Sequence, residues 1–214
     1  MLKNILTAAI LFLLFISCKK EEAIPAPPIV AADSTEKIVE LSTKYGKMYI
    51  WLYKATPLHR TNFIKLAEEG YYDNTTFHRI INDFMIQGGD PNSKDTDSTN
   101  DGSGGPNYTI PAEINNIIKH ERGALAAART NNPAKASSGS QFYICHSTSG
   151  TAGLNNNYTV FGMVMQGLNI IDSIIQQPKN RANDRPFINQ TMQVKVLKKT
   201  LQEIKTTYNY EPKF

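Results

Sequence analysis

Residues 77–90 read Phe-His-Arg-Ile-Ile-Asn-Asp-Phe-Met-Ile-Gln-Gly-Gly-Asp. The β-branched and aromatic residues of this stretch predict two strand segments, Thr76–Ile80 and Phe84–Gln87. Because side chains alternate along a strand, His78 and Arg79 are expected on opposite faces. If Arg79 faces a groove, His78 faces the interior, where we interpret it as a hydrogen-bonded core histidine.

Outward from this stretch, the sequence predicts more short strands and two helices. Thr56-Pro57 opens the first helix, with Thr as N-cap and Pro at the first helical position, and Gly70 ends it. The second helix covers Leu168–Gln176, whose isoleucines form an apolar face. Many short strands with two helices indicate a closed or sandwiched antiparallel sheet. The other predicted strands are 38–43 and 47–53, which form a hairpin, and Ala124–Ala128, Gln141–Cys145, Val160–Val164 and Gln193–Thr200.

The stretch 77–90 strongly resembles the signature of the cyclophilins, which are peptidyl-prolyl cis-trans isomerases. The resemblance covers roughly 37–203 and implies the family's mainly β fold, a closed eight-stranded antiparallel β-barrel capped by two α-helices. It also implies the family's activity, which is to accelerate rotation about X-Pro peptide bonds. Four further segments match the family in order and spacing: Gly102–Gly105, Ser140–Ile144, Leu154-Asn155 and Tyr158–Gly162.

This reaction needs no nucleophile, metal or redox group, so no cofactor and no metal ligand are expected. Rotation about a peptide bond faces a barrier of ~18–20 kcal/mol, and a catalyst must bind the twisted amide better than either planar form. Twisting returns the lone pair to the prolyl nitrogen, and a fixed cation aimed at that nitrogen stabilises the twisted state. The guanidinium of Arg79 stays charged and offers donors in a rigid fork. By resemblance, Arg79 is the catalytic arginine.

The resemblance also implies a site for the proline ring and for the substrate backbone. Phe84 and Met85 are neighbours that would point to opposite faces of a regular strand, so both can line a groove only if the backbone bends there. Gln87 is implied as a second catalytic residue, which holds the substrate backbone and orients the arginine. Arg129 replaces an asparagine that many members carry, and this favours an acidic flank in the substrate. The implied substrate-binding residues are Phe84, Met85, Ala128, Arg129, Gln141, Tyr143, Leu154 and Tyr158.

Three further positions depart from the family pattern. Tyr143 stands where phenylalanine is commonest, and its hydroxyl needs a partner and is expected to narrow the pocket mouth. Tyr158 stands where many members have histidine, so we assign it no proton-relay role. Gly153 stands where a tryptophan often precedes the leucine in cyclosporin-sensitive members, and this predicts weak cyclosporin binding.

Residues 1–17 are predicted to be a bacterial lipoprotein signal peptide. Lys3 is followed by an apolar run over 5–16, which is too short to span a bilayer because a spanning helix needs ~20 residues. Cys18 follows a small residue at the end of this run, which resembles a lipobox and implies acylation of Cys18. A plain signal peptide with an incidental cysteine is the alternative.

The rest of the chain is divided into three predicted parts. Residues 18–36 are interpreted as a Pro/Ala-rich tether, 37–203 as the isomerase domain and 204–214 as a loose polar tail. The Lys-Glu-Glu run at 20–22 either resembles a surface-export tag or is a solvated spacer. These features predict a lipid-anchored protein of the cell envelope, on the periplasmic or surface face of the outer membrane.

Proline-containing peptides and folding envelope proteins are the expected partners, and the protein is expected to be a monomer. A cyclophilin fold used as a chaperone or peptide-binding module, with incidental catalysis, is the alternative. The excess of 23 Lys and Arg over 19 acids gives a net charge of +4, which is too small to predict nucleic-acid binding.

The cysteine count excludes further classes. Two cysteines cannot form a disulfide-rich scaffold or a four-cysteine zinc site. With Cys18 acylated, Cys145 has no disulfide partner and is expected to be a buried thiol. The acidic loop 95–101 is interpreted as a solvated loop rather than a calcium site, because its ligand pattern is incomplete.

Overall fold

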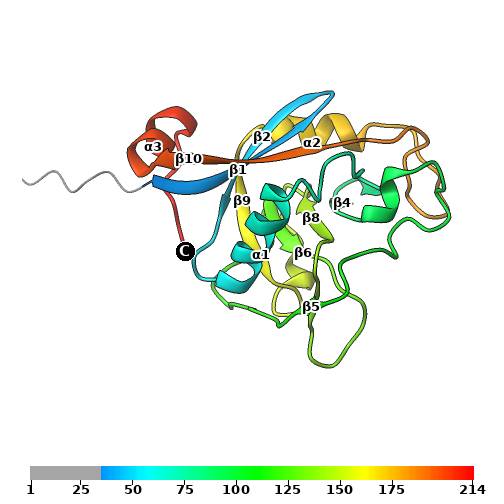
Figure 1. Ribbon diagram of the computed structural model, residues 1–214, viewed down its shortest axis with the longest axis horizontal. Coiled ribbons are helices and arrows are strands. Elements are labelled where there is room, and N and C mark those ends of the chain that lie inside the picture. Colours follow the sequence, from blue (N-terminus) through cyan, green and yellow to red (C-terminus); the bar gives the residue numbers. More distant parts are fainter. Residues whose placement is uncertain (1–34) are drawn as a thin grey trace, which may run out of the picture. The chain divides into compact units, whose positions relative to one another are not determined.

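An antiparallel sheet of eight strands organises residues 35–214, which are the residues that the computed structural model describes (Figure 1). The strands lie in the order β10-β1-β2-β9-β6-β8-β4-β3, and β5 pairs with β7 in a separate two-stranded ladder. The bounds of the strands are β1 (Thr35–Thr43), β2 (Gly46–Leu52), β3 (Arg79–Ile81), β4 (Met85–Gly88), β5 (Thr109–Ile110), β6 (Ala124–Ala127), β7 (Ser137–Ser138), β8 (Phe142–Cys145), β9 (Val160–Gln166) and β10 (Gln193–Thr200). The helices are α1 (Pro57–Glu68), α2 (Leu168–Ile175) and α3 (Leu201–Tyr208), with single 3-10 turns at Pro91–Lys94 and Ala152–Leu154.

The sheet is not closed by strand pairing, which corrects the expected closed barrel. Within the described residues, β3 and β10 end the sheet and do not pair with each other. Instead, the irregular segment 74–77 before β3 bonds to the segment 190–192 before β10. Asn74 donates to the carbonyl of Met192 at 3.0 Å, and Phe77 donates to that of Gln190 at 2.9 Å. These bonds satisfy buried backbone groups where the two sheet edges meet, without a regular ladder.

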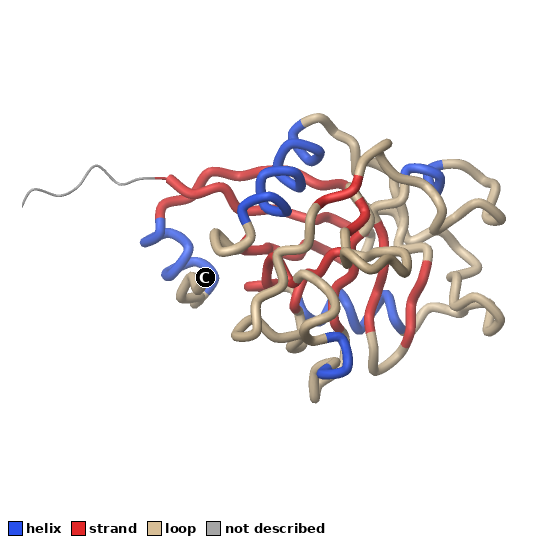
Figure 2. Tube along the Cα trace, turned by 90° about the horizontal axis from the view of Figure 1, so that it is seen from below, coloured by secondary structure: helices blue, strands red, loops and turns tan. Residues whose placement is uncertain are grey.

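The main core lies against one face of the curved sheet. Ile80, Ile86, Ile144 and Leu125 are register partners on adjacent strands, and all four are fully buried. Each such side chain contributes roughly 1.5–3 kcal/mol when it is removed from water. Helix α2 packs on the same cluster through Ile170, Ile171 and Ile174, as the isoleucine spacing predicts. Figure 2 shows the strands gathered in the middle of the molecule with the helices around them.

Helix α1 begins where the sequence predicts, but a different residue caps it. Thr56 is the N-cap and Pro57 is the first helical residue, yet the Thr56 hydroxyl donates to the carbonyl of Tyr53 and caps nothing. The carboxylate of Glu113 accepts the backbone N–H groups of Leu58 and His59, both at 2.9 Å. An anion at the helix N-terminus satisfies unpaired N–H groups and the positive end of the helix dipole.

The C-terminal residues are ordered against the domain, so the expected loose tail over 204–214 is wrong. Helix α3 starts with a capping box, in which Thr200 accepts from the Glu203 N–H and Glu203 accepts from the Thr200 N–H. Ile204 is fully buried and Tyr208 is nearly so. At the end of the chain, the Lys213 carbonyl accepts from the indole N–H of Trp51 at 3.1 Å.

The predicted signal peptide, Cys18 and most of the predicted tether lie outside the described residues. Strand β1 starts at Thr35, two residues before the predicted domain boundary, and Thr35 and Glu36 pair with Thr200 and Lys199 of β10. No helix among residues 35–214 is long and apolar enough to cross a membrane.

Candidate active site

The face of the sheet opposite the main core presents a row of side chains from four adjacent strands. Arg79 of β3 is paired in register with Gln87 of β4, Gln87 with Tyr143 of β8, and Tyr143 with Ala126 of β6. Register partners in an antiparallel ladder share one face, so the four side chains line up across the sheet. Arg79 and Gln87 are only partly buried, whereas Tyr143 is 5% exposed and forms a floor.

A pocket of about 130 Å³ opens on this row. Nine of the ten residues that the sequence predicts for the site outside Cys18 line it, and Gln141, the tenth, lies directly behind it. We call the apolar part of the pocket, Phe84, Met85, Tyr143 and Leu154, the cup. The lining residues are Arg79, Phe84, Met85, Gln87, Ala128, Arg129, Tyr143, Leu154 and Tyr158.

The backbone bends between Phe84 and Met85, as the sequence requires if both are to line the pocket. Residues 82–84 form the turn of the β3–β4 hairpin, with Asp83 at a φ of 52°, and β4 starts only at Met85. Asparagine and aspartate tolerate this left-handed conformation better than other residues with a side chain. Phe84 therefore belongs to the turn and is not bound by strand alternation.

The amide of Gln87 is oriented by Gln141. Both N–H groups of the Gln141 amide are used, because its Nε2 donates to the carbonyls of Gly102 and Gly104 at 2.9 and 2.7 Å. Its Oε1 therefore faces Gln87 and accepts from Gln87 Nε2 at 3.0 Å. This arrangement leaves the Oε1 of Gln87 available to Arg79 or to an N–H of a substrate.

The glycine-rich loop behind Gln141 is held by Asp90, a residue for which no role was predicted. Asp90 is fully buried, and its carboxylate accepts from the N–H groups of Asn92, Gly102 and Gly104. A Cβ at Gly104 would lie 2.2 Å from an Asp90 oxygen, so the loop fits this carboxylate only without a side chain there. The signal was present in the sequence, since Asp90 follows Gly88-Gly89 and ends the quoted stretch.

Comparison with known proteins identifies the family. The model of the family described as "cyclophilin type peptidyl-prolyl cis-trans isomerase/CLD" matches residues 38–196. The chain belongs to the cyclophilin family. It is 37% identical over 158 residues to peptidyl-prolyl cis-trans isomerase cypE of Dictyostelium discoideum, which covers 72% of this chain and 92% of that protein. It is 45% identical over 116 residues to peptidyl-prolyl cis-trans isomerase B of Bacillus subtilis, which covers 54% of this chain and 73% of that protein.

The fold of this cyclophilin agrees with solved structures. A crystal structure of a cyclophilin-type isomerase from Cryptosporidium parvum, determined in the presence of the dipeptide Ala-Pro, superimposes with a TM-score of 0.66 at 30% identity. It covers 75% of this chain and 98% of that chain. The predicted cyclophilin fold and peptidyl-prolyl cis-trans isomerase activity are thereby confirmed.

The hydroxyl of Tyr143 in this cyclophilin has a partner, as predicted, and the narrowing of the pocket mouth stays a prediction. The hydroxyl meets the Nε2 of His120 at 2.9 Å, and the Nδ1 of His120 meets the Oδ1 of Asn155 at 2.8 Å. Because an amide oxygen can only accept, Nδ1 carries the proton and Nε2 accepts from Tyr143. His120 thus connects the floor of the cup to the segment that carries Leu154 and Tyr158. The sequence did not predict this role of His120, because its partners Tyr143 and Asn155 lie far from it along the chain.

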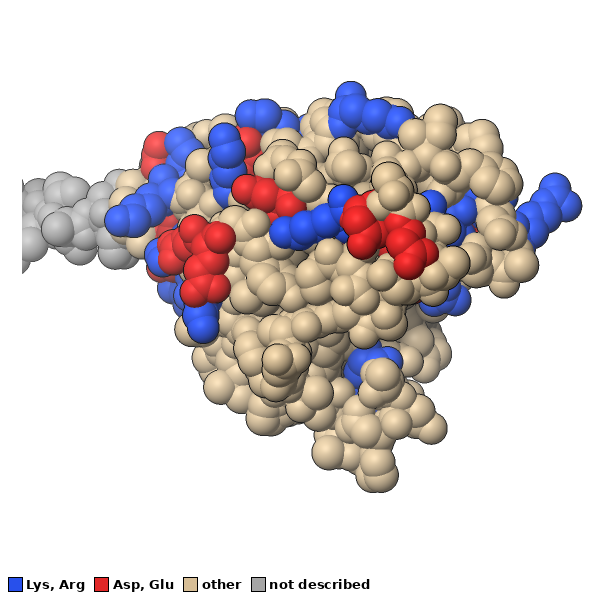
Figure 3. All heavy atoms as spheres, turned by 45° about the vertical axis from the view of Figure 1, so that its right-hand side comes forward, with Lys and Arg blue, Asp and Glu red and all other residues tan. Residues whose placement is uncertain are grey.

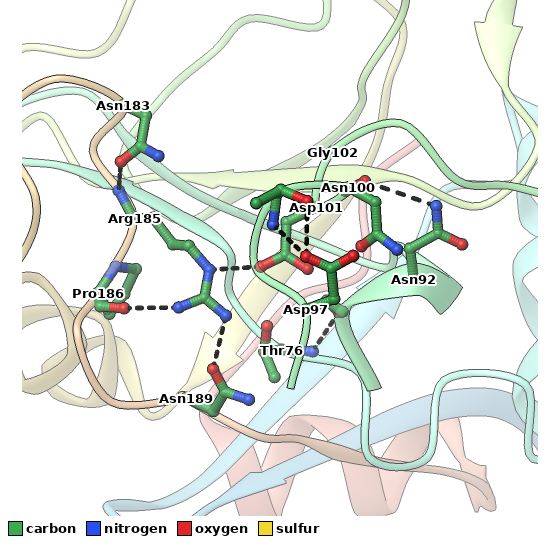
Figure 4. A network of polar contacts seen from close by, with 12 residues as sticks. Thr76, Asn92, Asp97, Asn100, Asp101, Gly102, Asn183, Arg185, Pro186 and Asn189 are labelled. Atoms are coloured by element: carbon green, nitrogen blue, oxygen red, sulfur yellow. Dashed lines mark hydrogen bonds and ion pairs between the residues drawn. The ribbon is translucent and has the colours of Figure 1, made fainter. Parts of the chain in front are cut away.

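His78 is buried, as predicted, but it is not the hydrogen-bonded core histidine that we expected. Neither ring nitrogen has a hydrogen-bond partner of good geometry within residues 35–214. Next to it, the acidic loop is tied to the rest of the domain by Arg185, whose Nε donates to Asp101 at 2.5 Å and whose NH2 donates to Asn189 at 2.8 Å (Figure 4). The carboxylate of Asp101 is therefore neutralised by a guanidinium.

The Cys145 thiol is fully buried, in agreement with the predicted buried thiol, and burial raises its pKa to about 11. No cluster of three or more potential metal ligands occurs within residues 35–214. Figure 3 shows acidic and basic side chains interspersed on one face, with no continuous patch of a single sign.

Lowering the pH from about 7 to about 5.5 is expected to destabilise the domain, although this range lies above the pH at which most carboxylates titrate. Burial lowers the pKa of His59, His78 and His120, whereas an unfolded histidine has a pKa of about 6.5. Below about pH 6.5 the unfolded chain therefore binds more protons than the folded one, and the free energy of unfolding falls as the pH drops. We expect a loss of at least roughly 1 kcal/mol between about pH 7 and pH 5.5, measured by urea unfolding. A free energy of unfolding that stays constant or rises as the pH falls over this range would contradict the lowered pKa values of these histidines.

Proposed function

We propose that this cyclophilin isomerises X-Pro bonds by seating the proline ring in the cup and aiming Arg79 at the prolyl nitrogen. The observation that carries the proposal is the register pairing of Arg79 with Gln87, which sets a guanidinium and an oriented amide beside an apolar pocket. The apolar cup fits the ring, and the polar edge lies where the amide nitrogen and the backbone would come.

The proposed catalysis is electrostatic and non-covalent. As the amide twists, its nitrogen gains a lone pair, and the guanidinium of Arg79 can donate to it. Because the planar forms lack this acceptor, the interaction is made in the twisted state and lowers the barrier. The free Oε1 of Gln87 would accept a backbone N–H of the substrate or hold the guanidinium, and Gln141 keeps that oxygen on the correct side.

An assay of isomerisation together with binding tests the proposal against the alternative of a peptide-binding module. A protease-coupled assay on a Xaa-Pro peptide is expected to show an isomerisation rate that rises in proportion to the enzyme concentration, and NMR shifts are expected at the residues of the cup. Shifts at the cup without any acceleration would instead support a binding module.

We further propose that the protein is a lipoprotein of the cell envelope and that its clients are proteins that fold or reside there. The support is the sequence alone: a short apolar run after Lys3, the lipobox-like Cys18, and a Pro/Ala-rich stretch before β1. About 16 residues between Cys18 and Thr35 would extend to roughly 50 Å, because an extended chain advances 3.3–3.6 Å per residue. This reach would allow the pocket to meet clients away from the membrane surface.

Replacing Cys18 with serine is expected to move the protein from the membrane fraction to the soluble fraction and to prevent its labelling by radioactive palmitate. The physical reason is the loss of acyl chains, each of which contributes ~0.8 kcal/mol per buried methylene. Cys145→Ser serves as the matched control, because that thiol is buried in the domain. Membrane association that survives Cys18→Ser would overturn the lipid anchor.

Cyclosporin is expected to bind weakly, with an inhibition constant far above the nanomolar range. Gly153 lies in the exposed turn before Leu154, and a Cβ built on it would contact nothing within 4 Å. The surface therefore lacks the large apolar side chain that the resemblance places there. Gly153→Trp, which has room, is expected to tighten inhibition, and a low-nanomolar constant for the wild type would show that this position is not decisive.

A further inference from the structure

We propose that Arg129 makes this isomerase prefer substrates that carry an acidic side chain close to the proline. The inference rests on the proposed function, because it assumes that the proline ring occupies the cup. It adds a substrate class, namely peptides with aspartate or glutamate in the segment that leaves the cup beside Arg129.

Arg129 lies where two depressions meet. The pocket of the cup and a neighbouring groove of about 580 Å³ share three lining residues, Gln87, Ala128 and Arg129. The groove continues along the glycine-rich loop 102–105. A peptide whose proline is in the cup and whose adjoining residues follow the groove must therefore pass the guanidinium of Arg129.

The guanidinium is held in place before a substrate arrives. Its Nε donates to the carbonyl of Asn157 at 3.0 Å, and NH1 donates to the carbonyl of Thr130 at 3.1 Å. The guanidinium carbon lies 4.7 Å from the centroid of the Tyr158 ring, within the range of a cation–π contact. Two of its five N–H groups are thus used for positioning, and the others are left to a ligand. A pre-positioned guanidinium loses less side-chain entropy when it binds a carboxylate.

No charge in its surroundings neutralises Arg129. The residues that line the pocket and the groove include Arg79 and Arg129 but no aspartate or glutamate. Within residues 35–214, Arg129 makes no ion pair. Lys135 adds a third positive charge nearby, since its ammonium donates to the carbonyl of Asn156.

The acidic residues closest to the groove are already engaged. Asp90 is buried under the glycine-rich loop and bound to its N–H groups, and Asp101 is paired with Arg185 (Figure 4). A peptide therefore meets unpaired positive charge and uncharged hydrogen-bonding groups. Carboxylates form the strongest and most directional contacts with such a guanidinium.

The test compares matched peptides on three proteins. Glutamate, glutamine or lysine is placed in turn at each of the two residues before and the two residues after the proline, and kcat/KM is measured for wild type, Arg129→Asn and Arg181→Asn. Arg181 is exposed and lines neither depression, so its variant removes one positive charge elsewhere on the surface. We expect glutamate to exceed glutamine roughly two- to fivefold at one or more positions for wild type and Arg181→Asn, because partly exposed ion pairs contribute up to about a factor of five.

The preference is expected to disappear in Arg129→Asn and to weaken with added salt. A ratio of glutamate to glutamine that is near one at all four positions in wild type, or that is unchanged in Arg129→Asn, would overturn the inference. Failure of the proposed function is a separate result, in which wild type accelerates none of the twelve peptides.

Discussion

Arg79→Ala is expected to lower kcat/KM for X-Pro isomerisation by roughly 10²–10³-fold, which is the usual effect of removing one donor that acts on developing charge. The loss should fall mainly on kcat, because the contact with the prolyl nitrogen forms only as the amide twists. Arg79 is partly exposed, and the apolar residues of the cup remain, so the peptide should still bind.

Three comparisons make this prediction specific. Arg79→Lys keeps the charge but loses the fork, and it should recover only part of the activity. Arg181→Ala removes a charge from an exposed residue that lines neither the pocket nor the groove, and it should leave the rate unchanged. The unfolding temperature of Arg79→Ala should match that of wild type, because Arg79 belongs to neither of the two hydrophobic clusters of the domain. An Arg79→Ala rate within about threefold of wild type would refute the assigned role.

Ile204→Ala is expected to lower the free energy of unfolding by about 2–5 kcal/mol, the usual range for truncating a large buried aliphatic side chain. Ile204 is fully buried in the second hydrophobic cluster, together with Ile38, Trp51 and Tyr208. Its loss leaves a cavity between α3 and the sheet. Urea unfolding measures the change.

Gln202→Ala is the matched control, since Gln202 is an exposed residue of the same helix and alanine favours helix formation. Its stability should stay within about 0.5 kcal/mol of wild type. If Ile204→Ala is equally harmless, α3 does not contribute to the domain in solution.

Local sequence patterns predicted most strands and the helices α1 and α2, because these elements depend on residue preferences within a few positions. The strand predicted over Gln193–Thr200 agrees with β10, and the predicted helix Leu168–Gln176 differs from α2 by one residue. The bend at Phe84 was inferred from two neighbours that had to share one pocket, and Asp83 supplies it.

The features that the sequence did not predict depend either on residues far apart in the chain or on a local pattern that was overlooked. Glu113 caps α1 across more than fifty positions, and no local rule connects it to Leu58. His120 meets Tyr143 only after two separate segments have folded together. Helix α3, in contrast, could have been found, because Thr200 and Glu203 have the spacing of a capping box and precede the buried Ile204.

The order of strands in the sheet has a consequence for how the chain acquires its structure. The first strand, β1, lies between β2 and β10, and β10 is the last strand to be synthesised. Contacts between such distant segments form slowly, because the long intervening chain must close first. The pairing of β1 with β10 therefore cannot form until the chain has been synthesised as far as Thr200. For a protein exported as we propose, this delay is useful, since a chain that waits for its last strand remains unfolded while it passes through a membrane channel.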